Sequence, residues 1–532
     1  MDLERDAYQA LEDIVGPEYI TEDPAIRDTY NQVWGNKLLF DEKWSTRPGA
    51  IVLPASTEEV QAIIRVCNRH KVTFKAFASG FEVVGTAFQT EKAVSIDLRR
   101  MDKIIDIDVK NMTAVVEPFV SAHRLNLELA KHGLFFGGIS GGPSSSVISI
   151  TCAHFGSGFT QVSTGGLGRN VLGCEWVLPT GELLTLGTGE SGNGWYSADG
   201  PGFSLRGILR GHSGANGGHG VITKAAVKLY PWYGPSEWEL KGSPPANKVL
   251  PEQFEMLKTY VFTMRDMDHV LDAMRDFGQS EVCFAVDMVH GMQIKEGNDE
   301  FMAYVMQTMQ TCPEKLDMLG RSVYVVIGAD TKREFDYKEK LLFAVNEKLG
   351  GEYRKEMNDP QELAWRMQYT AWAFGTVREC FRWAGDFHIV PNIDGTIDAI
   401  KTVCKIGAEM FAKYAGEGGP IMAPGGFPFP PPYENYSTGG HLEHVFIYDP
   451  CDQKSVEGAR EFIGKCLDTE GELAPYGVPC LGGGLSIEPV THLVQNWGPK
   501  YDNYHLWMAK IKAMLDPNTI CDWSAYVPPV FP

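Results

Sequence analysis

A long stretch of small residues constrains the fold of this chain more than any other feature. Residues 137–168 read GGISGGPSSSVISITCAHFGSGFTQVSTGGLG and consist largely of Gly, Ser and Thr. The stretch is too long for an ordinary connection inside a compact domain, and functional loops are the usual exception. Small side chains also allow a ligand to approach the backbone. We therefore expect this segment to line a binding site.

The segment from Ile51 predicts a βαβ unit. Ser56 is a suitable N-cap, Glu59 follows three residues later, and apolar residues then recur at helical spacing up to Cys67. The next loop, residues 77–85 (FASGFEVVG), offers backbone N–H groups with little side-chain obstruction and could hold a pyrophosphate without a lysine. Taken alone, the loop is equally typical of a turn-rich connection in a plain α/β domain.

Strands and helices alternate through the following residues. We expect a strand at VSIDL, a strand pair with its turn at Lys110-Asn111, and a helix that Gly133 closes. A hairpin with its turn at residues 179–181 follows, and then a second glycine-rich loop leads into a strand, GANGGHGVITKAAVKLYP. Near Tyr233 the pattern changes to longer amphipathic helices, which predicts a separate substrate-covering domain.

Length, charge and cysteine spacing exclude several classes of protein. A chain of 532 residues exceeds the size of one growing core, and the net charge of -20 disfavours binding to nucleic acid or anionic lipid. The cysteines contain no CxxC pair, which disfavours iron–sulfur clusters and zinc ribbons. The charged N-terminus and the absence of a long apolar run predict a cytoplasmic protein without membrane insertion.

The order of these motifs resembles the FAD-binding domain of the vanillyl-alcohol oxidase / p-cresol methylhydroxylase-type family, whose FAD-linked oxidases and dehydrogenases include the flavin-binding chain of glycolate oxidase. The resemblance covers roughly residues 45–235 and 480–525, and IKAMLDPNTI resembles the returning C-terminal segment of the family. It implies an α+β fold: a two-subdomain FAD-binding domain (1–235), an inserted α+β cap domain (236–480) and a C-terminal segment that returns to the FAD domain (481–532).

The resemblance also implies which residues bind FAD. The pyrophosphate would lie on the first loop, the ribityl chain and flavin ring along the long small-residue stretch, and the backbone at 220–222 would complete the site. His154 could stabilise the reduced ring or could be a packing residue. The implied FAD-binding residues are Ala78, Ser79, Gly80, Phe81, Glu82, Gly85, Ser144, Ser145, Ser146, His154, Gly156, Gly158, Gly165, Gly166, Arg169, Asn170, Val171, Gly220, Val221 and Ile222.

The chain departs from the family pattern at three places. Phe81 stands where some members carry a flavin-linked His, and Ser144 stands where some carry a flavin-linked Cys, so neither link can form there. A covalent link from the cap domain is left open. Thr164-Gly165-Gly166 replaces the segment in which phenol oxidases place a carboxylate, which weakens a 4-alkylphenol assignment.

Two clusters of titratable residues are candidates for the chemistry. Oxidation of a hydroxyl needs a base, and His441, Glu488 and His492 are our catalytic candidates. The hydroxy-acid dehydrogenases bind a divalent metal through two His and one Glu, which here implies His441, His444 and Glu488. On a strand the two histidines would face opposite sides, so His441 is the preferred ligand. The alternative is that these are strand-edge and loop residues without a catalytic role.

Substrate contacts are expected from the cap domain. Arg378 and Arg382 are spaced to clamp a carboxylate, and Tyr433 and Tyr436 stand beside a proline-rich loop. Alternatively, the two arginines lie on a solvated helix face, and the loop beside the two tyrosines is a structural cover. Of the four, Arg378 and Tyr436 are our substrate-binding predictions.

These features predict an FAD-dependent oxidoreductase that oxidises a small hydroxylated substrate, a 2-hydroxy acid or an alcohol, by hydride transfer to flavin N5. We expect a small-molecule substrate and an electron-accepting protein or other acceptor as partners, and a homodimer is compatible with the sequence. The alternatives are oxidation of a phenolic or benzylic aryl substrate, a non-oxidative flavin synthase, and a flavin-binding module without turnover.

Overall fold

The structure, a computed structural model of the chain, describes most of its residues. The described ranges are 3–30, 46–80, 88, 90–137, 144–153, 158, 160–189, 194–195, 203–209, 218–237, 239–241, 248–249, 253–288, 320–355, 386–414, 439–449, 451–476 and 497–522.

The N-terminal part is built on a four-stranded sheet with the order β1-β2-β4-β3. Strands β2, β4 and β3 run parallel, and α3 connects β2 to β3, which confirms the predicted βαβ unit. The Ser56 side chain accepts a hydrogen bond from Glu59 N at 3.2 Å, which fixes the start of α3 as predicted. The elements are α1 (Arg5–Val15), a 3-10 turn (Pro17–Tyr19), β1 (Ile20–Thr21), α2 (Pro24–Thr29), β2 (Ala50–Val52), α3 (Thr57–His70), β3 (Phe74–Phe77) and β4 (Val94–Asp97).

A five-stranded antiparallel sheet with the order β5-β6-β10-β8-β9 follows. The predicted strand pair forms β5 and β6, and the predicted hairpin forms β8 and β9, with Gly181 at φ +83° in its turn. The elements are β5 (Ile104–Asp108), β6 (Thr113–Val116), α4 (Ala122–Ala130), β7 (Leu134–Phe135), a π-type turn (Ser149–Ala153), α5 (Gln161–Thr164), a 3-10 turn (Leu167–Arg169), β8 (Val171–Val177), β9 (Leu183–Leu186), α6 (Arg206–Leu209), β10 (Val221–Lys228) and β11 (Tyr230–Pro231).

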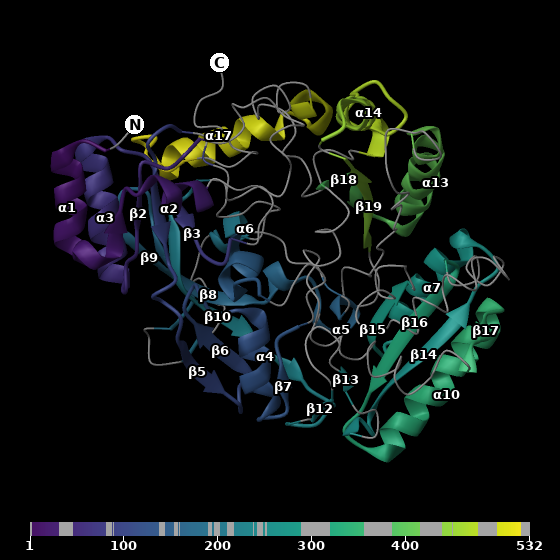
Figure 1. Cartoon of the computed structure of the whole chain (residues 1–532). Coiled ribbons are helices and arrows are strands. Elements are labelled where there is room, and N and C mark those ends of the chain that lie inside the picture. Colours follow the sequence, from purple (N-terminus) through teal and green to yellow (C-terminus); the bar gives the residue numbers. More distant parts are fainter. Residues whose placement is uncertain are drawn as a thin grey trace.

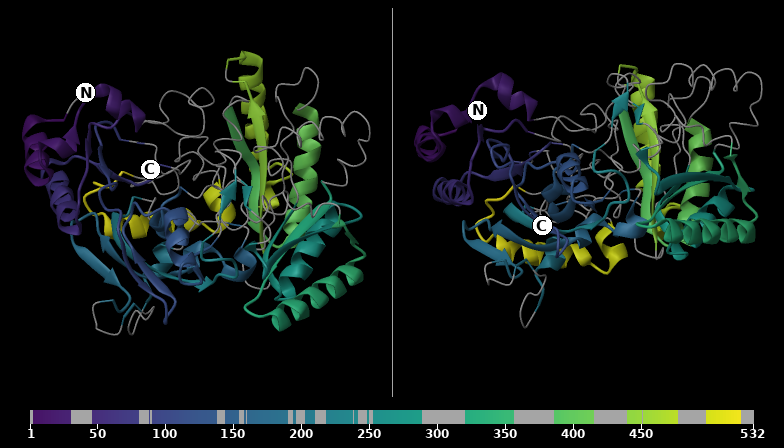
Figure 2. Two further views of the ribbon diagram at one scale, coloured as in Figure 1. Left: turned by 60° about the horizontal axis from the view of Figure 1, so that its bottom comes forward. Right: turned by 90° about the horizontal axis from the view of Figure 1, so that it is seen from below.

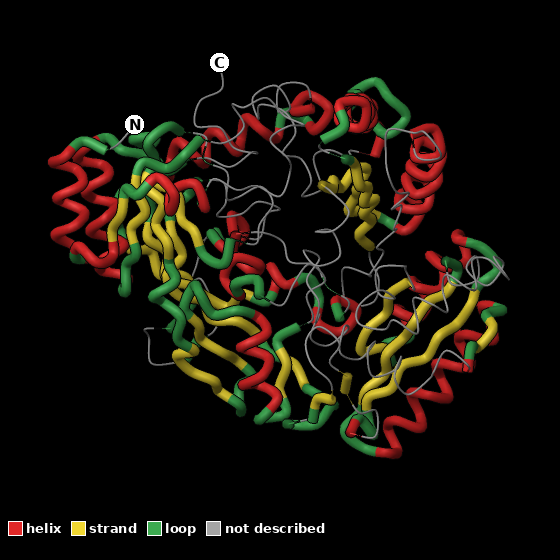
Figure 3. Tube along the Cα trace, viewed as in Figure 1, coloured by secondary structure: helices red, strands yellow, loops and turns green. Residues whose placement is uncertain are grey.

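A third, antiparallel sheet with the order β15-β16-β14-β17 lies beside the first two, on the right in Figure 1. Helices α7 and α10 pack on one of its faces, as the red helices flanking the yellow strands show in Figure 3. Its elements, with a small strand pair before them, are β12 (Leu240–Lys241), β13 (Lys248–Val249), β14 (Leu257–Thr263), α7 (Met267–Gln279), β15 (Cys283–Met288), β16 (Ser322–Gly328), α10 (Lys332–Leu349) and β17 (Glu352–Tyr353).

A two-stranded antiparallel ribbon, β18 with β19, packs against α13 and α14 through a core that includes Leu442 and Tyr448. Among the described helices, none combines the length and the apolar character that crossing a membrane requires. The elements are β18 (Asp386–Gly395), α13 (Ile397–Tyr414), β19 (Gly440–Tyr448), α14 (Gln453–Cys466) and a 3-10 turn (Ala474–Tyr476).

The chain ends by returning to its beginning. After a 3-10 turn (Gly498–Tyr501), helix α17 (Tyr504–Leu515) runs back toward the N-terminal sheets, as the yellow helix in both views of Figure 2 shows. Cys521 then forms a parallel bridge with Phe74 of β3. The helix stops at Asp516-Pro517, as the sequence predicts, because proline cannot continue it.

A buried ammonium group fixes this return. Lys512 Nζ donates to Asp516 Oδ2 at 2.5 Å, to Gly218 O at 2.5 Å and to Cys521 O at 2.9 Å, and both side chains of the ion pair are 1% exposed. The carboxylate of Asp516 also accepts the backbone N–H groups of Ile520 and Cys521. One ion pair therefore joins α17, the C-terminal strand and the segment that enters β10.

We predict that Lys512→Met lowers the free energy of unfolding by about 3–5 kcal/mol, because it leaves the Asp516 carboxylate buried without its cation. Chemical denaturation measures this change when the free energy of unfolding depends on denaturant concentration with the same slope in the wild type and the variant. The control is Lys500→Met, which removes an exposed ion pair with Glu470 and should change the stability by less than about 1 kcal/mol. Equal effects of the two substitutions would contradict the role assigned to Lys512.

Candidate cofactor site

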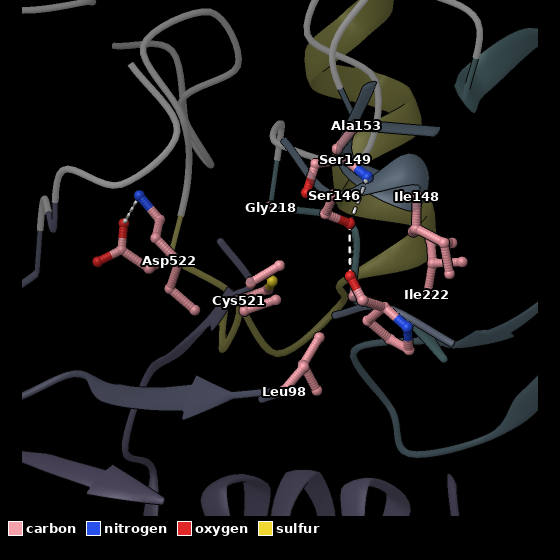
Figure 4. A pocket seen from close by; sticks show the side chains of 14 residues that line it. Leu98, Ser146, Ile148, Ser149, Ala153, Gly218, Ile222, Cys521 and Asp522 are labelled. Carbon is pink, nitrogen blue, oxygen red and sulfur yellow. Dashed lines mark hydrogen bonds and ion pairs between the residues drawn. The ribbon is translucent and has the colours of Figure 1, made fainter. Parts of the chain in front are cut away.

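A pocket opens where four distant segments meet (Figure 4). It lies between the end of β3, the middle of the small-residue stretch, the entry to β10 and the C-terminal strand, residues 520–522, which pairs with Phe74 of β3. The residues that line it are Lys75, Ala76, Ala78, Leu98, Pro118, Ser146, Ile148, Ser149, Ala153, Gly218, Gly220, Ile222, Cys521 and Asp522. Three of the segments that the sequence assigned to FAD thus lie around one pocket.

Two glycines keep the backbone of the pocket accessible. Gly80 has φ +64° and Gly220 has φ +117°, conformations that residues with a side chain rarely adopt. A Cβ atom on Gly220 would lie 2.2 Å from Val177 O, and one on Gly80 would lie 2.5 Å from the Phe77 ring. Both positions therefore favour glycine, and Gly220 presents bare backbone to the pocket.

Serine side chains connect the first loop to the small-residue stretch. Ser79 Oγ accepts a hydrogen bond from Ser146 N at 3.1 Å. Ser146 Oγ donates to Pro118 O at 2.5 Å and accepts from Ser149 N at 3.2 Å, as the dashed lines in Figure 4 show. These bonds hold the two loops predicted to bind FAD in a fixed relation, with Ser145 buried beside them.

Among the described residues, two buried polar atoms in the segments that the sequence assigns to FAD are without a hydrogen-bond partner. They are Nε2 of Gln161, whose side chain oxygen accepts from Gly158 N at 2.6 Å, and Nδ1 of His219, which stands between two lining glycines. Burial and the nearby Lys512 lower the pKa of His219 to about 4, so its ring is neutral at pH 7. Buried polar atoms are normally satisfied by protein, water or a ligand. Together with the glycine backbone, these atoms fit a cofactor rich in polar groups.

The remaining FAD-binding predictions on described residues lie close in the chain to this pocket or on the adjoining sheet. Gly165 has φ +70°, and Asn170 Oδ1 accepts a hydrogen bond from Tyr230 OH at 2.6 Å, which anchors the turn that begins β8. Gly166 and Arg169 flank that turn, and Val171 and Val221 lie in strands β8 and β10. Whether each of them contacts FAD stays a prediction.

The third sheet covers the small-residue stretch. Ser163 of α5 donates from Oγ to Phe284 O of β15 at 2.8 Å, and Val162 joins the hydrophobic core of that sheet. On the sheet face away from α7 and α10, Tyr324 OH donates to Asp287 Oδ2 at 3.3 Å, and both residues are buried. The sequence analysis did not identify this pair of a carboxylate and a phenol. The only sign of it in the sequence is the alternation of side chains between the two faces of an apolar strand.

Sequence reasoning also missed Lys75, Cys521 and Asp522 of the pocket. A lysine inside a parallel strand gives no motif, and the other two residues lie more than 430 positions away in the chain. Burial raises the pKa of the Cys521 thiol to about 12, so this cysteine is no nucleophile at neutral pH.

Several predicted site residues lie outside the described part of the chain. These are Phe81, Glu82, Gly85, His154, Gly156, Arg378, Tyr436, Glu488 and His492. Ser144 is described and exposed, and its neighbours Ser145 and Ser146 are buried. The catalytic and substrate-binding assignments thus remain predictions.

The two histidines of β19 lie three residues apart on a strand, as expected. His444 is 1% exposed, packs with its ring 5.9 Å from that of Phe411, and lies directly against Gly407 of α13. This position favours the packing interpretation of His444. The side chain of His441 is outside the described set, and within the described ranges no group of three His, Cys, Asp or Glu could hold a metal. The metal site is therefore still a prediction.

Comparison with known proteins agrees with this geometry. Residues 48–187 match the model of a family described as an FAD binding domain. Glycolate oxidase subunit GlcD of Bacillus subtilis is 28% identical over 234 residues, 43% of this chain and 46% of that protein. The probable mitochondrial D-lactate dehydrogenase of Danio rerio is 30% identical over 34% of this chain and 35% of its own length. The chain thus spans less than half the length of these two relatives.

Solved structures match nearly the whole chain. A p-cresol methylhydroxylase structure with substrate bound superimposes with a TM-score of 0.72 at 20% identity, over 97% of this chain and 95% of that one. An alkyldihydroxyacetonephosphate synthase superimposes with a TM-score of 0.66 at 17% identity, over 98% and 85% of the two chains. At these identities the likeness establishes the α+β fold, and the FAD-binding assignment comes from the family match of residues 48–187.

We predict that Gly80→Val yields protein with little bound FAD, because the new side chain meets Phe77 and forces the loop to change its backbone conformation. The ratio of flavin absorbance to protein absorbance measures the loss. Gly133→Val is the control, since Gly133 has a similar φ of +69° but open space around its Cβ position. Stoichiometric FAD in Gly80→Val would refute the loop assignment.

Proposed function

We propose that this chain is an FAD-linked oxidoreductase of the p-cresol methylhydroxylase type that oxidises a small hydroxylated substrate, a 2-hydroxy acid or an alcohol, and passes the electrons to a protein or another acceptor. The match of residues 48–187 to an FAD binding domain, the glycolate oxidase relative and the fold shared with p-cresol methylhydroxylase support the proposal. The observation that carries the proposal is the pocket itself. The Ser79–Ser146 hydrogen bond joins the two loops that the sequence assigns to FAD, and both loops lie within the residues that match the FAD binding domain.

FAD supplies the hydride acceptor when it is bound. The protein must position the substrate, exclude water and take the hydroxyl proton. The docking of β15 on α5 supports the exclusion of water at this seam, because Ser163 and Val162 bring the third sheet onto the small-residue stretch. We propose Glu488, His492 and His441 for proton transfer and substrate binding, and Arg378 and Tyr436 as further substrate contacts.

The substrate class is tested by an anaerobic spectrum of the purified protein, titrated with hydroxy acids and phenolic alcohols, with and without EDTA. The proposal expects the flavin absorbance to bleach with a hydroxy acid or an aliphatic alcohol. If EDTA prevents the bleaching, the result would support the metal site at His441, His444 and Glu488. Bleaching only by a phenolic alcohol would replace the proposal with aryl oxidation. No bleaching with any donor would leave a synthase or a non-catalytic flavin protein.

We predict that Glu488→Ala lowers the rate of flavin reduction by at least about 100-fold while FAD stays bound, because removal of a general base typically costs this much. Stopped-flow absorbance with the best donor measures the rate. Glu472→Ala, at an exposed position of the same region, is the control and should reduce at the wild-type rate. Unchanged reduction in Glu488→Ala would exclude this residue from proton transfer.

A further inference from the structure

The cofactor pocket contains a buried pair of opposite charges. Among the described residues that line it, Lys75 and Asp522 are the two with a formal charge, and the others are apolar, small or hydroxyl-bearing. Their side chains are 7% and 0% exposed, and Lys75 Nζ lies 3.4 Å from Asp522 Oδ1, as the dashed line beside Asp522 in Figure 4 shows. The pair joins the first sheet to the C-terminal strand.

The backbone fixes both members of the pair. Lys75 is the second residue of β3, and this strand runs directly into the loop that begins at Ala78. Asp522 N donates to Phe74 O at 2.8 Å, and Asp522 Oδ2 accepts from Thr90 N at 3.0 Å. The ammonium group also lies 5.7 Å from the centre of the Phe88 ring. The cation is therefore held in one place beside the start of the pyrophosphate loop.

Burial of this ion pair needs an explanation beyond stability. Removing two charges from water costs about as much as their attraction returns, and two apolar side chains of similar size often serve a fold equally well. A dinucleotide cofactor brings a diphosphate with two negative charges into the same pocket. Backbone N–H groups can bind such a group, but a fixed ammonium adds a charge-assisted hydrogen bond in a weakly solvated place.

We propose that Lys75 binds the diphosphate of FAD and that Asp522 of the C-terminal segment positions its ammonium group. The assignment rests on the proposed function only for the identity of the cofactor and is independent of the substrate. It makes the diphosphate site dependent on the C-terminal strand, which the Lys512–Asp516 ion pair holds in place.

The test measures binding of ADP, adenosine and FAD to the full-length chain freed of flavin, by calorimetry and flavin fluorescence. Lys75→Met should weaken the binding of ADP and FAD by roughly 10- to 100-fold, as expected for a lost charge-assisted hydrogen bond, and should change adenosine binding by less than about 3-fold. Lys75→Arg should restore much of the ADP affinity. Lys340→Met, an exposed lysine of α10, is the control for the loss of one positive charge.

The Asp522→Asn variant distinguishes a positioning role of Asp522 from a purely structural role. It also tests the proposal if the Lys75→Met variant does not fold. The amide keeps an acceptor for Thr90 N, but its NH2 group then faces the Lys75 ammonium group in place of the carboxylate oxygen that positions it. ADP binding should then weaken by a few-fold, less than in Lys75→Met, and adenosine binding should change by less than about 3-fold. Equal losses of ADP and adenosine affinity in Lys75→Met, or unchanged or tighter ADP binding in Asp522→Asn, would overturn the proposal. Substrate-driven bleaching of the wild-type protein is a separate measurement, so failure here leaves the proposed oxidation standing.

Discussion

The cofactor pocket depends on one buried ammonium group. Lys512 cannot be solvated in the interior, so its protons must go to fixed acceptors, and these are Asp516, Gly218 O and Cys521 O. The first belongs to the turn after α17, and the other two belong to walls of the pocket. Satisfying a single cation therefore brings together parts of the chain that are about 300 residues apart in sequence, and the pocket exists only when they meet.

The loops around the pocket are also held in fixed conformations. Gly80 and Gly220 hold backbone conformations that other residues resist, and Ser79 and Ser146 connect the loops by a hydrogen bond. A strand supports each loop. Strand β3 ends where the loop that contains Gly80 begins, and strand β10 begins directly after Gly220. A ligand that meets this backbone does not have to order it first, which reduces the entropic cost of binding.

The third sheet is attached to the small-residue stretch through its edge strand, β15. Phe284 of β15 packs among Phe135, Trp232 and Tyr233 and accepts a hydrogen bond from Ser163, so aromatic contacts and one polar contact share the seam. Asp287 and Tyr324 face away from α7 and α10 on this sheet. Sequence spacing placed His441 and His444 on one strand, but only packing against Gly407 and Phe411 showed that His444 faces the helices.

The sequence by itself determined the local elements and predicted the cofactor loops. Ser56 with Glu59 capped α3, Gly181 turned the β8–β9 hairpin and Pro517 ended α17, because capping, positive φ and the missing proline N–H act over a few residues. The tertiary structure alone decided that Lys75 meets Asp522 and that Lys512 reaches Gly218. Such pairings depend on which strands lie side by side, and buried charges leave no periodic pattern in a sequence because each is satisfied by a partner far along the chain.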